Sequence, residues 1–304
     1  MKILVTGSGG FLGHFLVKRL QSEGHEVITF SSKECDLTKR EGLNCFIETP
    51  FDQIYHLAAW TQAGDFCLHH PGEQWIQNQL MNTHVLDFWQ KRQPQAKLIA
   101  MGTSCGYDPT LPLEESYYLE GRPIESLFTY GMTKRMLLVG LQSLAKQYGL
   151  RYLYVIPSTL YGPNYHTDGR QMHFIFDLMR KILRGQEYHE KVTLWGDGYQ
   201  KREVVHVEQF VSQLLMINAK VENTLVNIGA GEEFSIREFA QLICYEVGYP
   251  FEKIEFDLTK YVGAKSKVLN TSFLKSLLTD VQKIPLQEGI KETLTWMAKC
   301  TAML

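Results

Sequence analysis

Short apolar runs alternate with amphipathic stretches along the first half of the chain. Residues 2–6 form a β-rich run, and residues 11–22 then place apolar side chains at the spacing of one helix face. The same alternation continues to about residue 156, and it is typical of βαβ units. We therefore predict an α/β fold with a doubly wound parallel sheet, with further strands at 26–30, 53–58, 97–101 and 151–156 and helices over 78–90 and 130–147.

The pattern changes after about Pro157. A turn cluster at residues 161–164 is followed by predicted helices separated by short strands, over 172–184, 207–219 and 235–247. We expect residues 1–160 to form the domain that carries the sheet. Residues 161–304 should form a smaller α/β lobe on its carboxyl side, although some segments can return to the first domain.

Composition narrows the class of protein. The 304 residues are 44% hydrophobic and 21% charged, as in folded globular proteins. The formal charge of -2 gives no basic field for nucleic acid or an anionic membrane. No run approaches the ~18 apolar residues of a membrane span, and the N-terminus lacks the apolar region of a signal peptide. Six scattered cysteines without a CxxC pair predict a reducing, cytoplasmic environment and no metal site.

A glycine-rich turn follows the first strand. Residues 6–13 read TGSGGFLG, with Gly7, Gly10 and Gly13 in a GxxGxxG spacing where a strand gives way to a helix. Glycines in this place let the backbone approach a pyrophosphate at a helix N-terminus. A tight turn without a ligand is the alternative. We predict a Rossmann-type dinucleotide site, to which Phe11 and Leu12 also contribute.

The end of the second strand bears on the choice of dinucleotide. NAD-binding proteins usually place an Asp or Glu there for the ribose 2'-hydroxyl, whereas this chain has Ser31, Ser32 and Lys33. A neutral and basic run favours the 2'-phosphate of NADP (as NADPH) over NAD. The alternative is a solvated loop with Glu34 just beyond. Further cofactor contacts are expected from strand ends and from the adenine side, at Asp36, Leu37, Leu57, Ala58, Ala59 and Pro157.

Tyr130 and Lys134 have the spacing YxxxK, which places both side chains on one face of a helix. An ammonium beside a phenol lowers the phenol pKa, so that Tyr130 could pass a proton near neutral pH. An exposed helix pair is the alternative. We expect both residues to contact cofactor as well as substrate. Thr103, just after the strand at 97–101, can hydrogen-bond a substrate oxygen.

Together, the motifs TGSGGFLG, HLAA, GTSCGY, YGMTK and IPSTLYGP resemble the extended short-chain dehydrogenase/reductase family, also called NAD-dependent epimerases/dehydratases, over nearly the whole chain. The sugar 4,6-dehydratases of that family carry Asp-Glu where this chain has Ser104-Cys105, so it lacks their acid and base. Six stretches are instead most similar to the GDP-L-fucose synthase subfamily: residues 102–107, 130–134 and 160–163, His173, and residues 195–203 and 229–236.

The resemblance implies an enzyme that uses NADPH to reduce carbon 4 of an NDP-4-keto-6-deoxyhexose, GDP-linked, with epimerisation at carbons 3 and 5, in nucleotide-sugar biosynthesis. Cys105 and His173 would be the acid/base pair for epimerisation, and Tyr130 would protonate the carbonyl oxygen. Arg202 would grip the diphosphate. Residues 161–304 would be the nucleotide-sugar lobe, with further substrate contacts at Thr159, Lys181 and Trp195. The resemblance also implies a homodimer through a four-helix bundle formed by parts of 78–90 and 130–147.

Three positions depart from the subfamily pattern. Thr159 replaces an Asn near the sugar, Gly106 replaces a β-branched residue, and residues 260–263 replace a Lys-Pro-Asp-Gly turn. Three other functions remain open. They are a 4-ketoreductase without epimerase activity, an epimerase that retains its NAD, and an NADP-binding regulatory protein without turnover.

Overall fold

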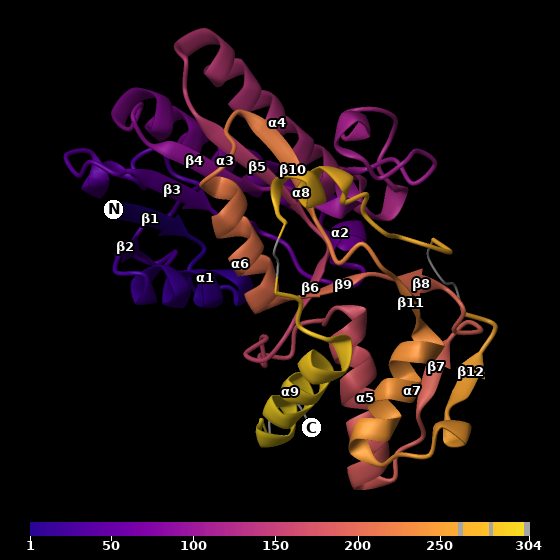
Figure 1. The fold of residues 1–304 in the computed structure, drawn as a ribbon. Coiled ribbons are helices and arrows are strands. Elements are labelled where there is room, and N and C mark those ends of the chain that lie inside the picture. Colours follow the sequence, from indigo (N-terminus) through magenta and orange to yellow (C-terminus); the bar gives the residue numbers. More distant parts are fainter. Residues whose placement is uncertain (261–263, 280–281, 301–304) are drawn as a thin grey trace.

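The computed structural model describes residues 1–260, 264–279 and 282–300. Its centre is a six-stranded sheet in the order β10-β5-β4-β3-β1-β2 (Figure 1), and each neighbouring pair is parallel. The chain passes from β1 to β2 on one side and then to β3 on the other, so the order reverses beside β1. The predicted Rossmann-type α/β fold is confirmed, with strands β1 (Lys2–Thr6), β2 (Glu26–Thr29), β3 (Gln53–His56), β4 (Lys97–Met101), β5 (Tyr152–Pro157) and β10 (Thr224–Ile228).

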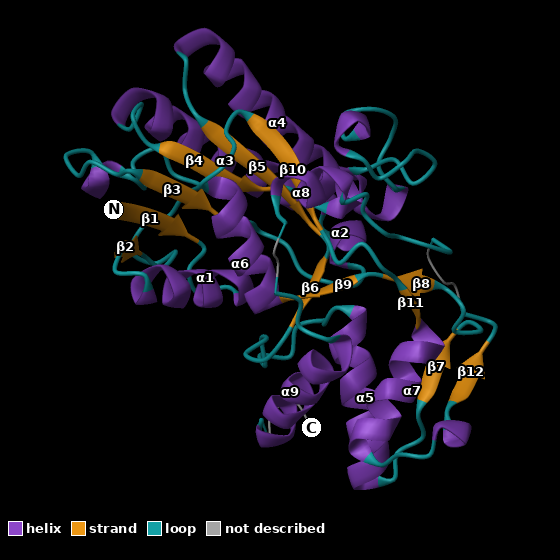
Figure 2. Cartoon of the chain, viewed as in Figure 1, coloured by secondary structure: helices purple, strands orange, loops and turns teal. Residues whose placement is uncertain are grey.

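The inner strands are apolar on both faces because helices cover both faces, as parallel sheets require. Leu98 and Ile99 of β4 point to opposite sides and are both fully buried. One face packs against α3 (Pro71–Arg92) and α4 (Phe128–Tyr148). The other packs against α1 (Phe11–Ser22), α6 (Val207–Asn218) and α8 (Ser272–Leu277). The sheet therefore lies between two layers of helices (Figure 2).

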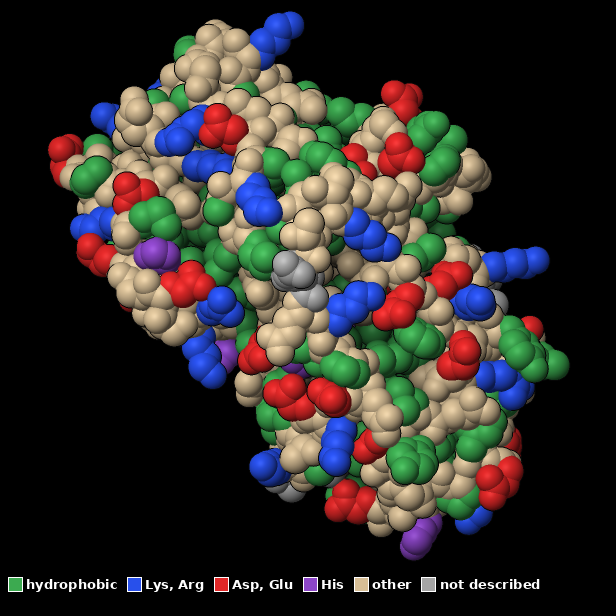
Figure 3. All heavy atoms as spheres, in the orientation of Figure 1, with side chains coloured by type: hydrophobic (Ala, Val, Ile, Leu, Met, Phe, Trp, Pro, Cys, Tyr) green, Lys and Arg blue, Asp and Glu red, His purple; other side chains and the backbone are tan. Residues whose placement is uncertain are grey.

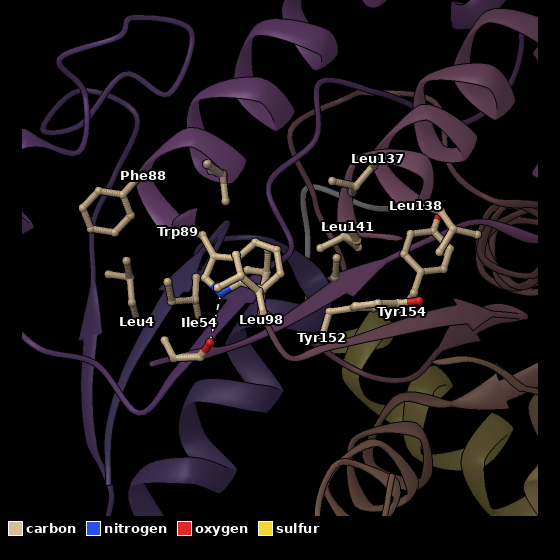
Figure 4. Close-up of a cluster of buried hydrophobic side chains, with 14 of the residues drawn as sticks. Leu4, Ile54, Phe88, Trp89, Leu98, Leu137, Leu138, Leu141, Tyr152 and Tyr154 are labelled. Atoms are coloured by element: carbon tan, nitrogen blue, oxygen red, sulfur yellow. Dashed lines mark hydrogen bonds between the residues drawn. The ribbon is translucent and has the colours of Figure 1, made fainter. Parts of the chain in front are cut away.

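Trp89 of α3 lies at the centre of the core beneath α3 and α4. Its side chain is fully buried among Leu4, Ile54 and Leu98 (Figure 4). The indole Nε1 donates a 2.9 Å hydrogen bond to the Ala96 carbonyl oxygen. A buried indole N–H needs such a partner, so Trp89 also fixes the turn that leads into β4.

The second half of the chain contributes both to the sheet and to a separate core. Strand β10 completes the central sheet beside β5. Around the separate core lie α5 (Phe174–Tyr188), α7 (Ile236–Val247) and α9 (Leu286–Lys299). Three two-stranded ladders accompany them: β6 (Thr159–Tyr161) with β9 (Val204–His206), β7 (Thr193–Trp195) with β12 (Glu255–Asp257), and β8 (Lys201–Arg202) with β11 (Phe234–Ser235). The shorter helices are α2 (Phe66–His69) and 3-10 turns at 44–46, 104–106, 115–117, 125–127 and 251–253.

Two boundaries differ from the sequence prediction for clear reasons. Helix α3 begins at Pro71 rather than at residue 78, because its buried face there is polar: Gln74, Asn78 and Asn82 are buried and hydrogen-bonded. Apolar periodicity does not register such a face. Strand β3 ends at His56 rather than at residue 58, since Leu57 and the residue after it leave the ladder to approach the glycine turn.

The surface carries mixed charge. On the face shown in Figure 3, acidic and basic side chains are interspersed. Across the described ranges, no helix combines the length and the apolar character needed to cross a membrane. Within the same ranges, no three His, Cys, Asp or Glu side chains gather as a metal site would require.

We predict that Trp89→Phe lowers the free energy of unfolding by about 1–3 kcal/mol, because it leaves the Ala96 carbonyl without its donor and removes buried atoms. Urea unfolding followed by circular dichroism measures the change. Trp195→Phe is the control, since Trp195 is exposed and should change stability by less than about 0.5 kcal/mol. Equal effects of the two substitutions would contradict this role of the Trp89 indole.

Candidate active site

The glycine turn lies at the carboxyl end of β1, where the strand order reverses. Gly7 has φ 71°, and Gly10, the N-cap of α1, donates to the Gly7 carbonyl oxygen over 3.0 Å. A Cβ on Gly13 would lie 2.3 Å from that same oxygen, and a Cβ on Gly7 would lie 2.7 Å from the Ala58 nitrogen. Only glycine fits these close approaches. The first turn of α1 has no acidic residue, which suits a bound anion.

The second predicted cofactor segment meets this turn directly. Leu57 and Ala58 lie against Gly7, and Ala59 follows them, half-buried. His56 fixes the segment from below: Thr6 Oγ1 lies 2.9 Å from its Nδ1, and Asn82 Oδ1 lies 3.0 Å from its Nε2. Burial, followed by the charge of Lys134, lowers the pKa of His56 to about 4, so the ring is neutral at physiological pH.

The loop after β2 is exposed at Ser31, Ser32 and Lys33. The Glu34 carboxylate folds back over this loop and accepts hydrogen bonds of 2.8 Å from both the backbone nitrogen and the hydroxyl of Ser31. These bonds lower the pKa of Glu34. The end of β2 therefore presents both the basic side chain of Lys33 and the carboxylate of Glu34, so the exposed loop considered as the alternative to an NADP site also fits the structure. Two further predicted cofactor contacts follow. The Asp36 carboxylate accepts hydrogen bonds from the backbone nitrogen and the hydroxyl of Thr38. Leu37 is buried, and its carbonyl oxygen lies 2.9 Å from His84 Nδ1.

The turn at Ser104–Gly106 places Cys105 beyond the end of β4. Thr103 Oγ1 accepts a hydrogen bond from the Cys105 backbone nitrogen (3.2 Å). Gly106 lies against the ring of Tyr118, whose hydroxyl oxygen a Cβ at Gly106 would approach to 2.5 Å. This contact explains why glycine replaces the β-branched residue that the subfamily pattern has here.

Arg135 of α4 supports the same turn. Its guanidinium is buried and donates to the carbonyl oxygens of Gly106 (2.7 Å), Gly121 (2.8 Å) and Glu120 (2.7 Å). Hydrogen bonds from a charged donor are stronger than neutral ones. Nothing in its local sequence singled out Arg135, because its partners are backbone carbonyl oxygens of the loop that precedes α4.

Tyr130 and Lys134 share one face of α4, as the YxxxK spacing predicts. The Lys134 Nζ lies 5.8 Å from the centre of the Tyr130 ring. Burial lowers the pKa of Lys134 to about 8, and burial together with the nearby Cys105 sulfur raises the pKa of Tyr130. The lowering of the Tyr130 pKa expected from the sequence is therefore absent from this structure. A phenol with a raised pKa holds its proton and can act as a donor.

Cys105 contacts Lys267, a residue that the sequence did not reveal, and the charges of these two groups act on Tyr130 and His173. The Lys267 Nζ donates to the Cys105 sulfur over 3.1 Å. Burial raises the pKa of the thiol, but the Lys267 charge and the hydrogen bonds to the sulfur outweigh it, so the pKa lies below its ordinary value. Desolvation and then Lys267 lower the pKa of His173, which is the N-cap of α5.

The predicted substrate residues lie on several elements. Pro157 ends β5, and Thr159 begins β6. The Arg202 guanidinium is half-buried and donates to the Lys201 and Ala264 carbonyl oxygens. Lys181 pairs with Asp177 at 2.8 Å, and Trp195 is exposed. The structure does not bring Lys181 or Trp195 into contact with Cys105. Of residues 260–263, the last three lie outside the described part of the chain.

The residues present fit a bound dinucleotide. Gly7 and Gly13 allow the tight backbone turn, a Cβ at Gly9 would meet no protein atom within 4 Å, and the N-terminus of α1 beside them has no side-chain cap. Helix α4, which carries Tyr130 and Lys134, contacts the turn at 104–106 that follows β4, two strands away from β1 in the sheet.

Comparison with known proteins agrees with this geometry. Residues 3–229 match the model of the NAD dependent epimerase/dehydratase family. The chain belongs to this family. A curated relative, GDP-L-fucose synthase 1 of Arabidopsis thaliana, is 28% identical over 98% of this chain and 93% of its own length.

Solved structures share the fold. A GDP-L-fucose synthetase from Naegleria fowleri bound to NADP has a TM-score of 0.86 at 24% identity and covers 98% of this chain and 94% of that one. UDP-glucose 4-epimerase from Thermotoga maritima has the same TM-score and identity and covers 99% of both chains. As a member of the epimerase/dehydratase family, the chain is an enzyme that works with a nicotinamide cofactor on nucleotide sugars.

We predict that Gly13→Ala weakens nicotinamide dinucleotide binding by about tenfold or more, about 1.4 kcal/mol, because its Cβ would collide with the Gly7 carbonyl. Titration with NADPH and with NADH measures the loss. Gly72→Ala is the matched control, since its Cβ meets nothing within 4 Å and Gly72 lies in α3, outside the glycine turn. If Gly13→Ala bound both cofactors as tightly as Gly72→Ala, the glycine turn would not be the cofactor site.

Proposed function

We propose that this enzyme uses NADPH to reduce carbon 4 of an NDP-4-keto-6-deoxyhexose, GDP-linked, after epimerising carbons 3 and 5. The observation that carries the proposal is the cluster of Tyr130, Cys105 and Lys267 beside the sheet edge. His173 lies close enough for the Lys267 charge to lower its pKa. A reductase needs a proton donor for the carbonyl oxygen. An epimerase also needs groups that remove and return protons beside the ketone.

Each residue has one task in this mechanism. A dinucleotide held at the glycine turn would supply the hydride for carbon 4. Tyr130 donates its proton to the carbonyl oxygen, a task suited to a phenol whose raised pKa keeps it protonated. Thr103 hydrogen-bonds the same oxygen. Cys105 and His173 exchange protons with the carbons on either side of the ketone, whose hydrogens the carbonyl group makes acidic.

NADPH is proposed as the cofactor because Ser31, Ser32 and Lys33 present neutral and basic groups at the end of β2. The NADP-bound Naegleria structure supports this choice. One observation favours an alternative: the Glu34 carboxylate at the same strand end could accept a ribose hydroxyl, as in an epimerase that retains NAD. Net consumption of NADPH separates the two.

The substrate lobe is proposed to comprise residues 161–304, with α6, β10 and α8 counted with the Rossmann domain because all three pack on or in the central sheet. Arg202 is proposed for the diphosphate, since a guanidinium suits its paired oxygens. Lys181, Trp195 and Thr159 are proposed as further substrate contacts. Lys181 would exchange its ion pair with Asp177 for a phosphate oxygen.

A homodimer is proposed through α3 and α4, which pack side by side (Figure 1). Both helices expose apolar side chains, and clusters of this kind mark interaction surfaces: Trp75, Ile76, Leu80, Met136 and Val139. Joining the same face of two copies would form a four-helix bundle.

Two substitutions should separate the two half-reactions with GDP-4-keto-6-deoxymannose in deuterium oxide. We predict that Cys105→Ala abolishes deuterium incorporation at carbons 3 and 5 but reduces a pre-epimerised substrate normally. Tyr130→Phe should slow reduction by about 10²–10⁴-fold, because it removes the proton donor. Mass analysis of the products and NADPH oxidation report the two steps.

The matched control is Cys45→Ala, because Cys45 is exposed and lies in another part of the chain. Deuterium exchange retained by Cys105→Ala would refute the assignment of the base. Reduction by the wild type without any exchange would identify a 4-ketoreductase that lacks epimerase activity.

The dimer proposal predicts that Ile76→Glu converts the protein to monomers, because it buries a carboxylate in the apolar contact. Sedimentation velocity measures the mass. Tyr245→Glu on α7 is the control, since Tyr245 is also an exposed apolar side chain but lies in the other lobe. A monomeric wild type would contradict the proposal.

A further inference from the structure

Lys267 and Cys105 touch although 162 positions separate them in the chain. The Lys267 Nζ donates to the Cys105 sulfur over 3.1 Å, and among the described residues no carboxylate neutralises this ammonium. We propose that Lys267 is the charge partner of Cys105: its ammonium stabilises the thiolate that is present before Cys105 takes up a proton and that forms again when Cys105 gives one up during epimerisation. The proposal rests on the function proposed above. Lys267 acts through Cys105 and is a positioning residue.

The backbone holds Lys267 in place from both sides. Two residues later, the Leu269 nitrogen donates to Glu203 Oε2 (3.0 Å), and the Gly231 nitrogen donates to Oε1 of the same carboxylate (2.7 Å). Glu203 is buried, so these bonds are shielded from water. Two residues earlier, the Lys265 carbonyl oxygen accepts from the Lys201 nitrogen (2.8 Å). These bonds fix the backbone on both sides of Lys267 and so place its side chain next to the Cys105 sulfur.

Lys267 is the cation that contacts the Cys105 sulfur, whereas the Arg135 guanidinium at the same turn donates to three backbone carbonyl oxygens. Six residues from five segments face the sulfur or interact with its charge. They are Thr103 and Ser104 of its own turn, Tyr118 of the following loop, Cys67 of α2, Tyr130 of α4 and Lys267 after β12. The two phenols and the Cys67 thiol have raised pKa values and are neutral near pH 7. His173 is neutral there too, because its pKa is lowered.

The proton transfer balances with these groups alone. When the thiolate removes a proton beside the ketone, an S–H bond forms, and the pair of the broken C–H bond moves into an enolate with its charge on the carbonyl oxygen. In the opposite direction the S–H bond breaks, a C–H bond forms, and the negative charge returns to the sulfur against the Lys267 ammonium. The ammonium thus stabilises the same state in both directions.

The test uses the full-length enzyme without substrate. Iodoacetamide alkylates a thiolate far faster than a thiol, and peptide mass spectrometry separates Cys105 from the other five cysteines. Removing the cation raises the thiol pKa, so Lys267→Met should shift the alkylation profile of Cys105 to higher pH. One pKa unit means about tenfold slower alkylation near neutral pH. Lys267→Arg keeps the charge and should keep the profile. Lys265→Met is the matched control, because Lys265 is exposed.

Turnover provides the second readout. Lys267→Met should slow deuterium exchange at carbons 3 and 5 by about tenfold, the same factor as the loss of thiolate, while reduction of a pre-epimerised substrate changes little. An unshifted alkylation profile overturns the proposal, whatever the turnover. A shifted profile in an enzyme whose wild type exchanges no substrate supports the charge pair and overturns the proposed function.

Discussion

The parallel orientation of the central strands is the constraint on which the rest of the site depends. Strands β1, β3, β4 and β5 all point the same way, so the segments that follow them meet at one edge. Gly7, Leu57, Thr103 and Thr159 each follow or lie just beyond one of these strands. One antiparallel pair would send its functional segment to the opposite edge. The reversal of strand order beside β1 then opens the place where a ligand binds in folds of this kind.

Buried hydrogen bonds fix the positions of the strands and helices that meet at this edge. Thr6, His56 and Asn82 link β1, β3 and α3, and Asn82 continues to the Thr133 carbonyl of α4. On the catalytic side, the Tyr154 hydroxyl donates to the Lys134 carbonyl oxygen and lies 3.1 Å from the hydroxyl of Tyr118. Polar groups in the interior are costly unless paired. Because each of these has a partner, the helix that carries Tyr130 is held against the sheet with little freedom.

The sequence was informative where function depends on contacts between near neighbours. The glycine spacing and YxxxK each concern one turn, so their placement could be predicted. The start of α3 could not, because Gln74 and Asn78 form a polar buried face. Helix α9 carries an apolar face that the sequence analysis did not single out.

Long-range contacts were beyond prediction for a different reason. Lys267 and Arg135 matter through partners that only the folded chain brings near, a sulfur in one case and three carbonyl oxygens in the other. The same holds for Tyr130: the spacing suggested a lowered pKa, but burial at the sheet edge raises it. The surroundings that set these pKa values come from segments far apart in the chain.

The central claim is that one site combines proton exchange beside a ketone with reduction of that ketone. The most direct measurement is turnover of GDP-4-keto-6-deoxymannose with NADPH in deuterium oxide, with this enzyme as the only one present. Analysis of the product then gives its mass and the carbons that carry deuterium. We predict one NADPH consumed per product, with one solvent deuterium at carbon 3 and one at carbon 5. An enzyme that carries tightly bound NAD and interconverts nucleotide sugars without net NADPH consumption would contradict the account.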